Sequence, residues 1–255
     1  MLIALATVAS LVVAQPAPAD TLWLQVGSPE VRNSRFVPHA ARVRVRVGEG
    51  EGRLVSEWTN ELTLGDSAGR PIHRWVTLGT QYPAGGEPVT FDLRQTFDAE
   101  TMAPLSYVSK SSSGASLVLR IDGQRVTGTR VTAGGGATQA VEMTVERPGF
   151  MAGASDLVPL AVGLTPGTVM VAPLWSPAMA NSELRVFTVL EQVRVMVEGA
   201  EVTAWKVAEH RYSDRTWLAD WYLLDQVPYM VYGEARQADG QIRRMTEVTI
   251  PMSRP

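Results

Sequence analysis

The chain has 255 residues, of which 45% are hydrophobic and 19% charged, the proportions of a globular protein and not of a disordered one. The 23 Lys and Arg residues and 26 Asp and Glu residues give a net charge of -3, which provides no electrostatic basis for binding nucleic acid. Cysteine is absent, which excludes disulfides, thiol nucleophiles, cysteine metal sites and lipid attachment to a cysteine.

The first residues predict export. Residues 1–19 contain no ionisable side chain, and most of this segment is an apolar run that is too short to span a membrane. The run leads to Ala17-Pro18-Ala19, a small-x-small sequence typical of signal cleavage sites. We therefore expect a signal peptide at 1–19, a single β-rich domain at 20–255, and a periplasmic or secreted location. An uncleaved anchor is the alternative. No transmembrane segment is expected after signal removal, because no other segment has eighteen consecutive apolar residues.

Alternation of side chains along the chain predicts strands. Valine alternates with arginine in 41–47, so one face of this strand should be buried and the other basic. The other segments with strand-like patterns are 22–26, 54–64, 72–78, 89–97, 105–109, 116–121, 125–132, 139–146, 169–172, 184–197, 202–212, 216–224, 229–235 and 241–250. Asp122-Gly123, Glu198-Gly199 and Asp239-Gly240 lie between such runs and predict tight turns. Strands joined by tight turns are antiparallel.

One helix is predicted, at 153–164. Ser155 is a candidate N-cap, and Pro159 limits the helix to a short or broken segment. The glycine-rich stretch at 133–137 is short enough to be a hairpin loop, so no domain linker is predicted. The expected fold class is all-β: an antiparallel, strongly curved sheet, as a half-barrel or barrel, with one short helix.

Several motifs between residues 90 and 250 resemble a family of bacterial exported proteins known only as a domain of unknown function. These motifs are Phe97-Asp98-x-x-Thr101, Ile121-Asp122-Gly123, Asp156-Leu157-Val158-Pro159-Leu160, Gly163-Leu164-x-Pro166-Gly167, Val197-x-Gly199 and the segment from Trp217 to Glu234. The resemblance implies a C-terminal antiparallel β region and supplies no catalytic residues. The sequence is also similar, more loosely, to the half-barrels of periplasmic lipoprotein carriers, which implies a curved sheet around an apolar groove. The absent cysteine departs from the lipidated relatives.

Motifs for catalysis and for cofactor binding are not found. His39, His73 and His210 lack the spacing of a helical metal pair, and no Gly-x-Ser-x-Gly or dinucleotide fingerprint is present. Glu209, His210 and Asp214 could form a hydrogen-bonded group near a strand end. We expect no metal, no cofactor and no enzymatic activity, with a hydrolase that uses an unidentified pair of acids as an alternative.

Aromatic side chains late in the chain are the best candidates for a binding site. Trp217 and Trp221 should share one strand face, and Tyr229 and Tyr232 follow within sixteen residues. Aromatic residues line apolar pockets, but they also fill cores, and both interpretations stay open here. Glu191 falls on the apolar face of the strand at 184–197, where it either lines a groove or is turned outward by a β-bulge. The predicted ligand-binding residues are Trp217, Trp221, Tyr229, Tyr232 and Glu191.

Two further interpretations concern partners. The arginines at 42, 44 and 46 could be a solvated edge or could attract anionic lipid head groups. The expected function is that of an exported cell-envelope binding protein with an apolar groove for a lipid-like or other hydrophobic ligand. The alternative is a non-enzymatic structural or assembly factor that contacts other envelope proteins.

Overall fold

The structure is a computed structural model that describes residues 21–32, 35–48, 52–237 and 240–252. The predicted signal peptide and its cleavage point lie outside these residues. The strands are β1 (Leu22–Trp23), β2 (His39–Val47), β3 (Arg53–Ser67), β4 (Arg70–Gln81), β5 (Val89–Asp98), β6 (Pro104–Ser111), β7 (Ser116–Asp122), β8 (Arg125–Val131), β9 (Gln139–Thr144), β10 (Phe150–Met151), β11 (Val169–Trp175), β12 (Glu183–Val197), β13 (Ala200–Arg211), β14 (Trp217–Leu223), β15 (Met230–Arg236) and β16 (Ile242–Ile250). Every predicted strand is present, and only the two-residue β10 was not predicted.

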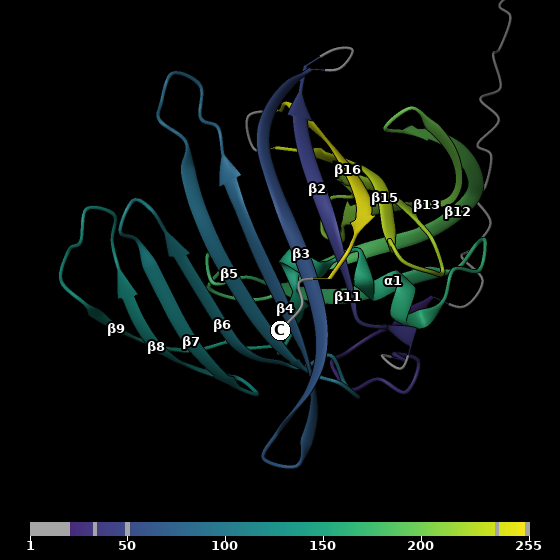
Figure 1. Cartoon of the computed structure of the whole chain (residues 1–255). Helices are drawn as coiled ribbons and strands as arrows, with labels where there is room; N and C mark the ends of the chain where they lie inside the picture. Colours follow the sequence, from purple (N-terminus) through teal and green to yellow (C-terminus); the bar gives the residue numbers. More distant parts are fainter. Residues whose placement is uncertain (1–20, 33–34, 49–51, 238–239, 253–255) are drawn as a thin grey trace, which may run out of the picture.

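The described strands form one sheet of sixteen, in the order β1-β11-β12-β13-β14-β15-β16-β2-β3-β4-β5-β6-β7-β8-β9, with β10 also paired to β11 (Figure 1). Neighbouring strands are antiparallel except where β1 and β10 join β11 in parallel. The sheet curves strongly but is not closed, which confirms the predicted fold class. After β9, the segment at 145–149 lies beside the loop that precedes β12, where the Ser182 hydroxyl donates to the Arg147 carbonyl at 2.5 Å.

The pairing of β16 with β2 gives the cavity its shape. This pair sets Met245 opposite Val45 and Glu247 opposite Val43, and so joins the end of the chain to its beginning. Alternation then places every second residue of each strand on the concave face. Shifts of register between β2 and β3, β12 and β13, β13 and β14, and β14 and β15 mark bulges, which increase local bending.

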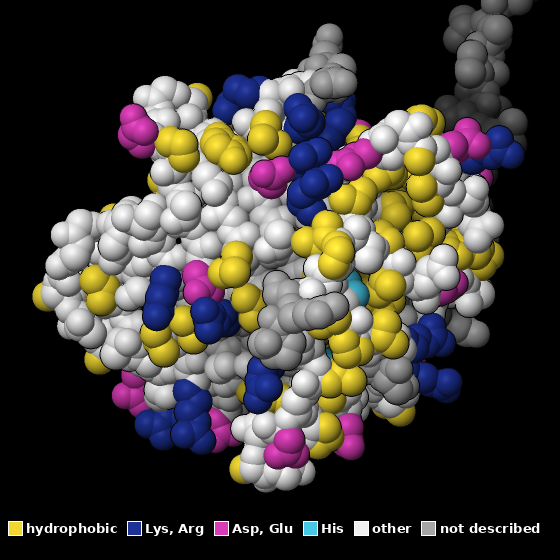
Figure 2. Space-filling view, viewed as in Figure 1, with side chains coloured by type: hydrophobic (Ala, Val, Ile, Leu, Met, Phe, Trp, Pro, Cys, Tyr) yellow, Lys and Arg dark blue, Asp and Glu magenta, His cyan; other side chains and the backbone are white. Residues whose placement is uncertain are grey.

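The hairpin of β12 and β13 folds back over the convex face of the sheet. Val197 and Ala204 from the hairpin pack with Val231 of β15 in a small second core. At the hairpin tip, Glu198 accepts hydrogen bonds from Arg42 at 3.1 Å and from Arg44 at 2.9 Å. Basic and acidic side chains accordingly lie side by side over β2 and β3 in Figure 2. The predicted basic face is therefore partly neutralised within the molecule.

The predicted helix is present inside the concave face. It consists of a 3-10 turn, η2 (Ala152–Ala154), followed by α1 (Leu157–Val162), whose residues are almost all buried in the main core (Figure 1). The predicted cap is wrong: Asp156 is the N-cap, with no side-chain capping bond. Ser155 is buried instead and hydrogen bonds Glu209, because the interior acid faces it. No helix in the described part of the chain is long and apolar enough to cross a membrane.

Candidate functional site

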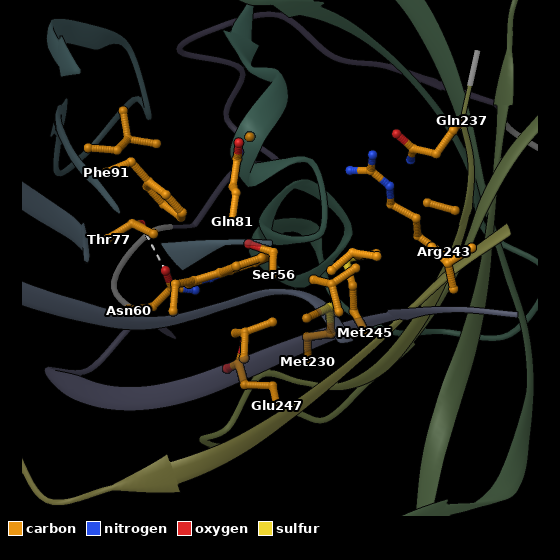
Figure 3. A pocket seen from close by; sticks show the side chains of 18 of the residues that line it. Ser56, Asn60, Thr77, Gln81, Phe91, Met230, Gln237, Arg243, Met245 and Glu247 are labelled. Carbon is orange, nitrogen blue, oxygen red and sulfur yellow. Dashed lines mark hydrogen bonds between the residues drawn. The ribbon is translucent and has the colours of Figure 1, made fainter. Parts of the chain in front are cut away.

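A cavity of about 820 Å³ lies on the concave face of the sheet, between β14 and β5 in the strand order, with the segment at 152–156 as its floor. Its lining includes Val43, Val45, Val47, Val55, Ser56, Trp58, Asn60, Trp75, Thr77, Gln81, Phe91, Leu93, Gln95, Gly153, Asp156, Trp221, Met230, Arg243, Met245 and Glu247. In Figure 3, Asn60, Thr77 and Phe91 face Arg243 and Met245 across the open space. The lining combines aromatic and aliphatic walls with polar groups.

One wall consists of two aromatic residues packed around a glycine. Trp58 and Phe91 flank Gly79 on neighbouring strands, and their ring centroids are 6.4 Å apart. A Cβ at Gly79 would lie 2.4 Å from Cβ of Trp58 and 2.7 Å from Cζ of Phe91. Only glycine fits here, and its missing side chain lets both rings approach the sheet. Both rings are only partly buried and stay accessible from the cavity.

The facing wall is built around Trp221 of β14. Its indole N–H donates to Oε2 of Glu209 at 2.8 Å, which fixes the orientation of the ring. Glu209 also accepts from Arg185 of β12, at 3.1 Å between Nη1 and Oε1. The ring contacts the main core on one side and the cavity on the other. Trp221 therefore belongs to both alternatives that the sequence left open, core and pocket.

Polar groups line the same cavity. The Thr77 hydroxyl donates to Oδ1 of Asn60 at 2.8 Å (Figure 3), and the Ser56 hydroxyl donates to the Thr80 carbonyl at 3.0 Å. Gln95 is 4% exposed, and its Oε1 has no hydrogen-bond partner in the described part of the chain. A buried acceptor without a partner loses its hydrogen bonds to water and gains none in the protein, which costs free energy. A donor supplied by water or a ligand would therefore be favourable there.

Three acids lie at or next to the floor: Glu209 and Glu247 are buried, and Asp156 is partly buried. Burial raises the pKa of Asp156 to about 7, with a further contribution from the nearby Glu209. Burial likewise raises the pKa of Glu247 well above its usual value, and the charge of Asp156 adds to this. The pKa of Glu209 is raised by burial, against the opposing effects of Trp221 and Arg185. Asp156 is surrounded by protein but presents part of its surface to the cavity, as Glu247 also does.

The structure separates the five predicted ligand-binding residues. Trp221 lines the cavity. Trp217 does not share its face, contrary to the prediction, because the bulge at Leu218 pairs His210 with Trp217 and Glu209 with Ala219. Trp217 lies on the convex face, where its indole N–H donates to Asp220 at 3.1 Å.

The other three lie elsewhere in the fold. Tyr229 is buried in the main core, and its hydroxyl donates to the Arg35 carbonyl at 2.9 Å. Tyr232 is on the convex face and donates to Glu234 at 2.8 Å. Glu191 is exposed within the bulge between β12 and β13. Of the two alternatives for this residue, the structure has the one in which a β-bulge turns it outward.

The lining residues that sequence reasoning missed come from strands far apart in the chain. Trp58, Phe91, Gln95 and Glu247 each sit in an ordinary alternating pattern, and nothing local distinguishes an inner face that lines a cavity from one that is packed. Asp156 lies near the start of the predicted helix, where an acidic residue is ordinary. The predicted grouping of Glu209 with His210 and Asp214 is not formed, because neighbouring strand residues point to opposite faces.

The described residues contain no group of three or more His, Cys, Asp and Glu side chains arranged to hold a metal ion. Fold and cavity together define an open, barrel-like antiparallel sheet with an internal helix. Among solved structures, the chain is similar to a β-barrel-like protein of domain of unknown function DUF1849 from Brucella abortus, with a TM-score of 0.52 and 10% identity over 86% of this chain and 100% of that chain. This likeness shows the fold alone. No family model and no curated protein matches the sequence.

Proposed function

We propose that the protein is a non-enzymatic binding protein that holds a hydrophobic or lipid-like small molecule in the cavity of its curved sheet. The observation that carries this proposal is a cavity of about 820 Å³ whose walls include Trp58, Phe91 and Trp221. Its volume falls within the range of small-molecule sites, roughly 300–1,000 Å³, and such sites combine apolar walls with a few polar groups.

The proposal includes the setting in which binding occurs. The apolar N-terminal run and its small-x-small sequence support export, and hence a role in the periplasm or outside the cell. The resemblance of residues 90–250 to an exported bacterial family supports the same setting. An assembly factor would instead bind envelope proteins and leave the cavity without a ligand. A hydrolase would turn over its ligand.

The test compares two tryptophans of the same strand. N-phenyl-1-naphthylamine, an uncharged fluorescent probe, is titrated into the wild type, Trp221→Ala, Trp58→Ala and Trp217→Ala. We expect Trp221→Ala and Trp58→Ala to weaken probe binding by about tenfold or more, the range for loss of one well-buried aromatic contact. Trp217→Ala is the matched control, because its ring lies on the convex face, and its affinity should equal that of the wild type.

Circular dichroism establishes that each variant is folded before titration. Native mass spectrometry of the wild type adds a second readout, since a binding protein can retain a small molecule during purification. Equal losses of affinity in Trp217→Ala and Trp221→Ala would show that the probe does not occupy the cavity. A wild type that takes up no probe would contradict the proposal itself.

A further inference from the structure

Side-chain oxygen acceptors lie on and around the floor of the cavity. Gln95 of β5 contributes an amide oxygen that is buried and lacks a partner among the described residues. Its Nε2 lies 3.8 Å from the position of a Cβ on Gly153, which places Gln95 beside the segment that carries Asp156. Glu247 of β16 lines the same space and is close enough to Asp156 to feel its charge. Three oxygen-bearing side chains from separate elements thus line the same cavity, Gln95 beside Gly153 and Glu247 within the electrostatic reach of Asp156.

The basic groups around this floor are already used or lie elsewhere. Neither Asp156 nor Glu247 forms an ion pair within the described part of the chain. Arg185 of β12 is held by Glu183 and Glu209. Arg53 of β3 donates to the Tyr82 carbonyl.

The remaining basic groups near the cavity do not reach the floor. Arg243 is on the same strand as Glu247 but four residues away, roughly 13 Å along the strand, and Figure 3 shows the two side chains well apart. The buried His39 and His73 are not part of the cavity lining. Among the described residues, the charged groups that act on Asp156 and Glu247 are therefore acidic, and the nearby Arg185 is paired with Glu209.

We propose that Asp156 on this floor, together with Glu247 and Gln95 of the adjoining strands, binds the ammonium group of an organic cation whose apolar body lies against Trp58, Phe91 and Trp221. This inference rests on the proposed function and names the class of ligand. An ammonium group has three N–H donors and no acceptor, which matches a set of acceptor oxygens. Its charge stabilises two carboxylates that otherwise repel. The Trp and Phe rings provide apolar surface for the body of the ligand.

Binding of such a cation is coupled to release of protons. Burial raises the pKa of Asp156 to about 7, so this acid is partly protonated near neutral pH in the empty cavity. Burial favours the protonated form of Glu247 as well. A cation entering the floor favours their charged forms, and the protons leave to solvent. A neutral alcohol has no such effect, and a carboxylate ligand adds a third acid to the site. We therefore expect the affinity of the cavity to be highest for an ammonium head group, lower for an alcohol and lowest for a carboxylate.

The experiment uses three probes with one chain length: dodecylamine, dodecan-1-ol and dodecanoate, each below its micellar concentration. Their affinities for the purified protein are measured at pH 7 by displacement of N-phenyl-1-naphthylamine. We expect dodecylamine to bind at least about tenfold more tightly than either other probe. In Asp156→Asn and Glu247→Gln, this preference should fall towards unity while dodecan-1-ol still binds. Glu142→Gln, which changes an exposed carboxylate on β9 outside the cavity lining, should keep the preference.

Calorimetry of the wild type gives a readout that needs no variant. Titrations of dodecylamine in two buffers with different ionisation enthalpies should show release of protons to the buffer, and titrations of dodecan-1-ol should show none. Equal affinities for all three probes, a preference for dodecanoate, or amine binding without proton release would overturn the ammonium subsite while the cavity stays a binding site. Failure of all three probes to bind would instead overturn the proposed function, and this inference with it.

Discussion

Gly233 of β15 lies directly beneath the indole of Trp221. The two residues are paired across β14 and β15, and a Cβ on Gly233 would lie 3.0 Å from both Cε3 and Cζ3 of the ring. The missing side chain lets the indole lie against the sheet while its N–H reaches Glu209. The position of one cavity wall thus depends on a glycine in the neighbouring strand.

Gly233→Ala tests this relationship. The added methyl group should push the ring away from the sheet and into the cavity, with a stability loss of about 1–3 kcal/mol from overpacking. Denaturant midpoints of the wild type, Gly233→Ala, Trp221→Ala and the double variant form a cycle. Once the indole is removed, Gly233→Ala should cost little. The same cost in both backgrounds would mean that the glycine is required for another reason.

Arg185 and Arg194 lie on the same strand, β12, and each forms an ion pair, one buried and one exposed. Arg185 is 17% exposed and pairs with Glu209, which is 5% exposed, whereas Arg194 and Glu201 are 75% and 55% exposed. Arg185→Met leaves a buried carboxylate without its cation, so we expect a loss of about 3–5 kcal/mol. Arg194→Met should cost about 1 kcal/mol or less. Urea denaturation measures both. Adding Glu209→Gln to Arg185→Met should restore much of the loss, and no restoration would argue against an electrostatic origin.

Asp156 should make the protein less stable as pH rises. Burial raises its pKa from 3.8 to about 7, so between these values the native state holds a proton that the unfolded chain has released. The free energy of unfolding therefore falls across this window, by on the order of 4 kcal/mol for a shift of about three pH units. Burial raises the pKa values of Glu209 and Glu247 too, which adds to the same trend.

The measurement is the urea midpoint between pH 4 and 8 for the wild type and Asp156→Asn. The variant should have a flatter profile and exceed the wild type in stability at pH 8. His39 and His73, whose pKa values are lowered by burial, act in the opposite sense below about pH 6.5 in both proteins, so they do not affect the difference.

Asp214→Asn serves as the control variant. Hydrogen bonds from Thr216 and Arg211 lower the pKa of Asp214 to about 2, so its contribution to the pH dependence of stability is confined to pH below about 4. Between pH 4 and 8, Asp214→Asn should therefore lower the whole profile without changing its slope. If the wild type and Asp156→Asn had parallel profiles, Asp156 would not be the source of the pH dependence.

The tip of the β12–β13 hairpin should be held to β2 by a salt-sensitive contact. Glu198 pairs with Arg42 and Arg44, and each of the three side chains is 34% exposed. Glu198→Asn removes the charge and introduces a residue that tolerates the positive φ of 46° at this turn. We expect a stability loss of about 1 kcal/mol or less at low salt, and a smaller one in 1 M NaCl. A loss that is independent of salt would assign the contact to packing instead.

The strands could be predicted because the signal for them is local. Most strands show alternation within their own sequence, as in residues 41–47, whereas β11 is a short apolar run. The tight turns at Asp122-Gly123 and Glu198-Gly199 fix antiparallel neighbours. The helix was also predicted, although its cap was not. The wrong prediction for Trp217 shows why alternation is not sufficient. One extra residue, Leu218, forms a bulge that turns Trp217 to the opposite face of β14.

The cavity could not be predicted, because it depends on which strands become neighbours. Glu247 and Val43 are about two hundred positions apart in the chain, yet the pairing of β16 with β2 makes them adjacent. Whether Trp58, Gln95 or Asp156 faces packed core or open space is decided by the curvature of the whole sheet and by the segment that fills its centre. The sequence by itself determined the strands, their antiparallel turns and the short helix, since these follow from neighbouring residues. Only the tertiary structure decided that two acids lie with amide and aromatic side chains around one space, since burial is a property of the whole curved sheet and not of any strand within it.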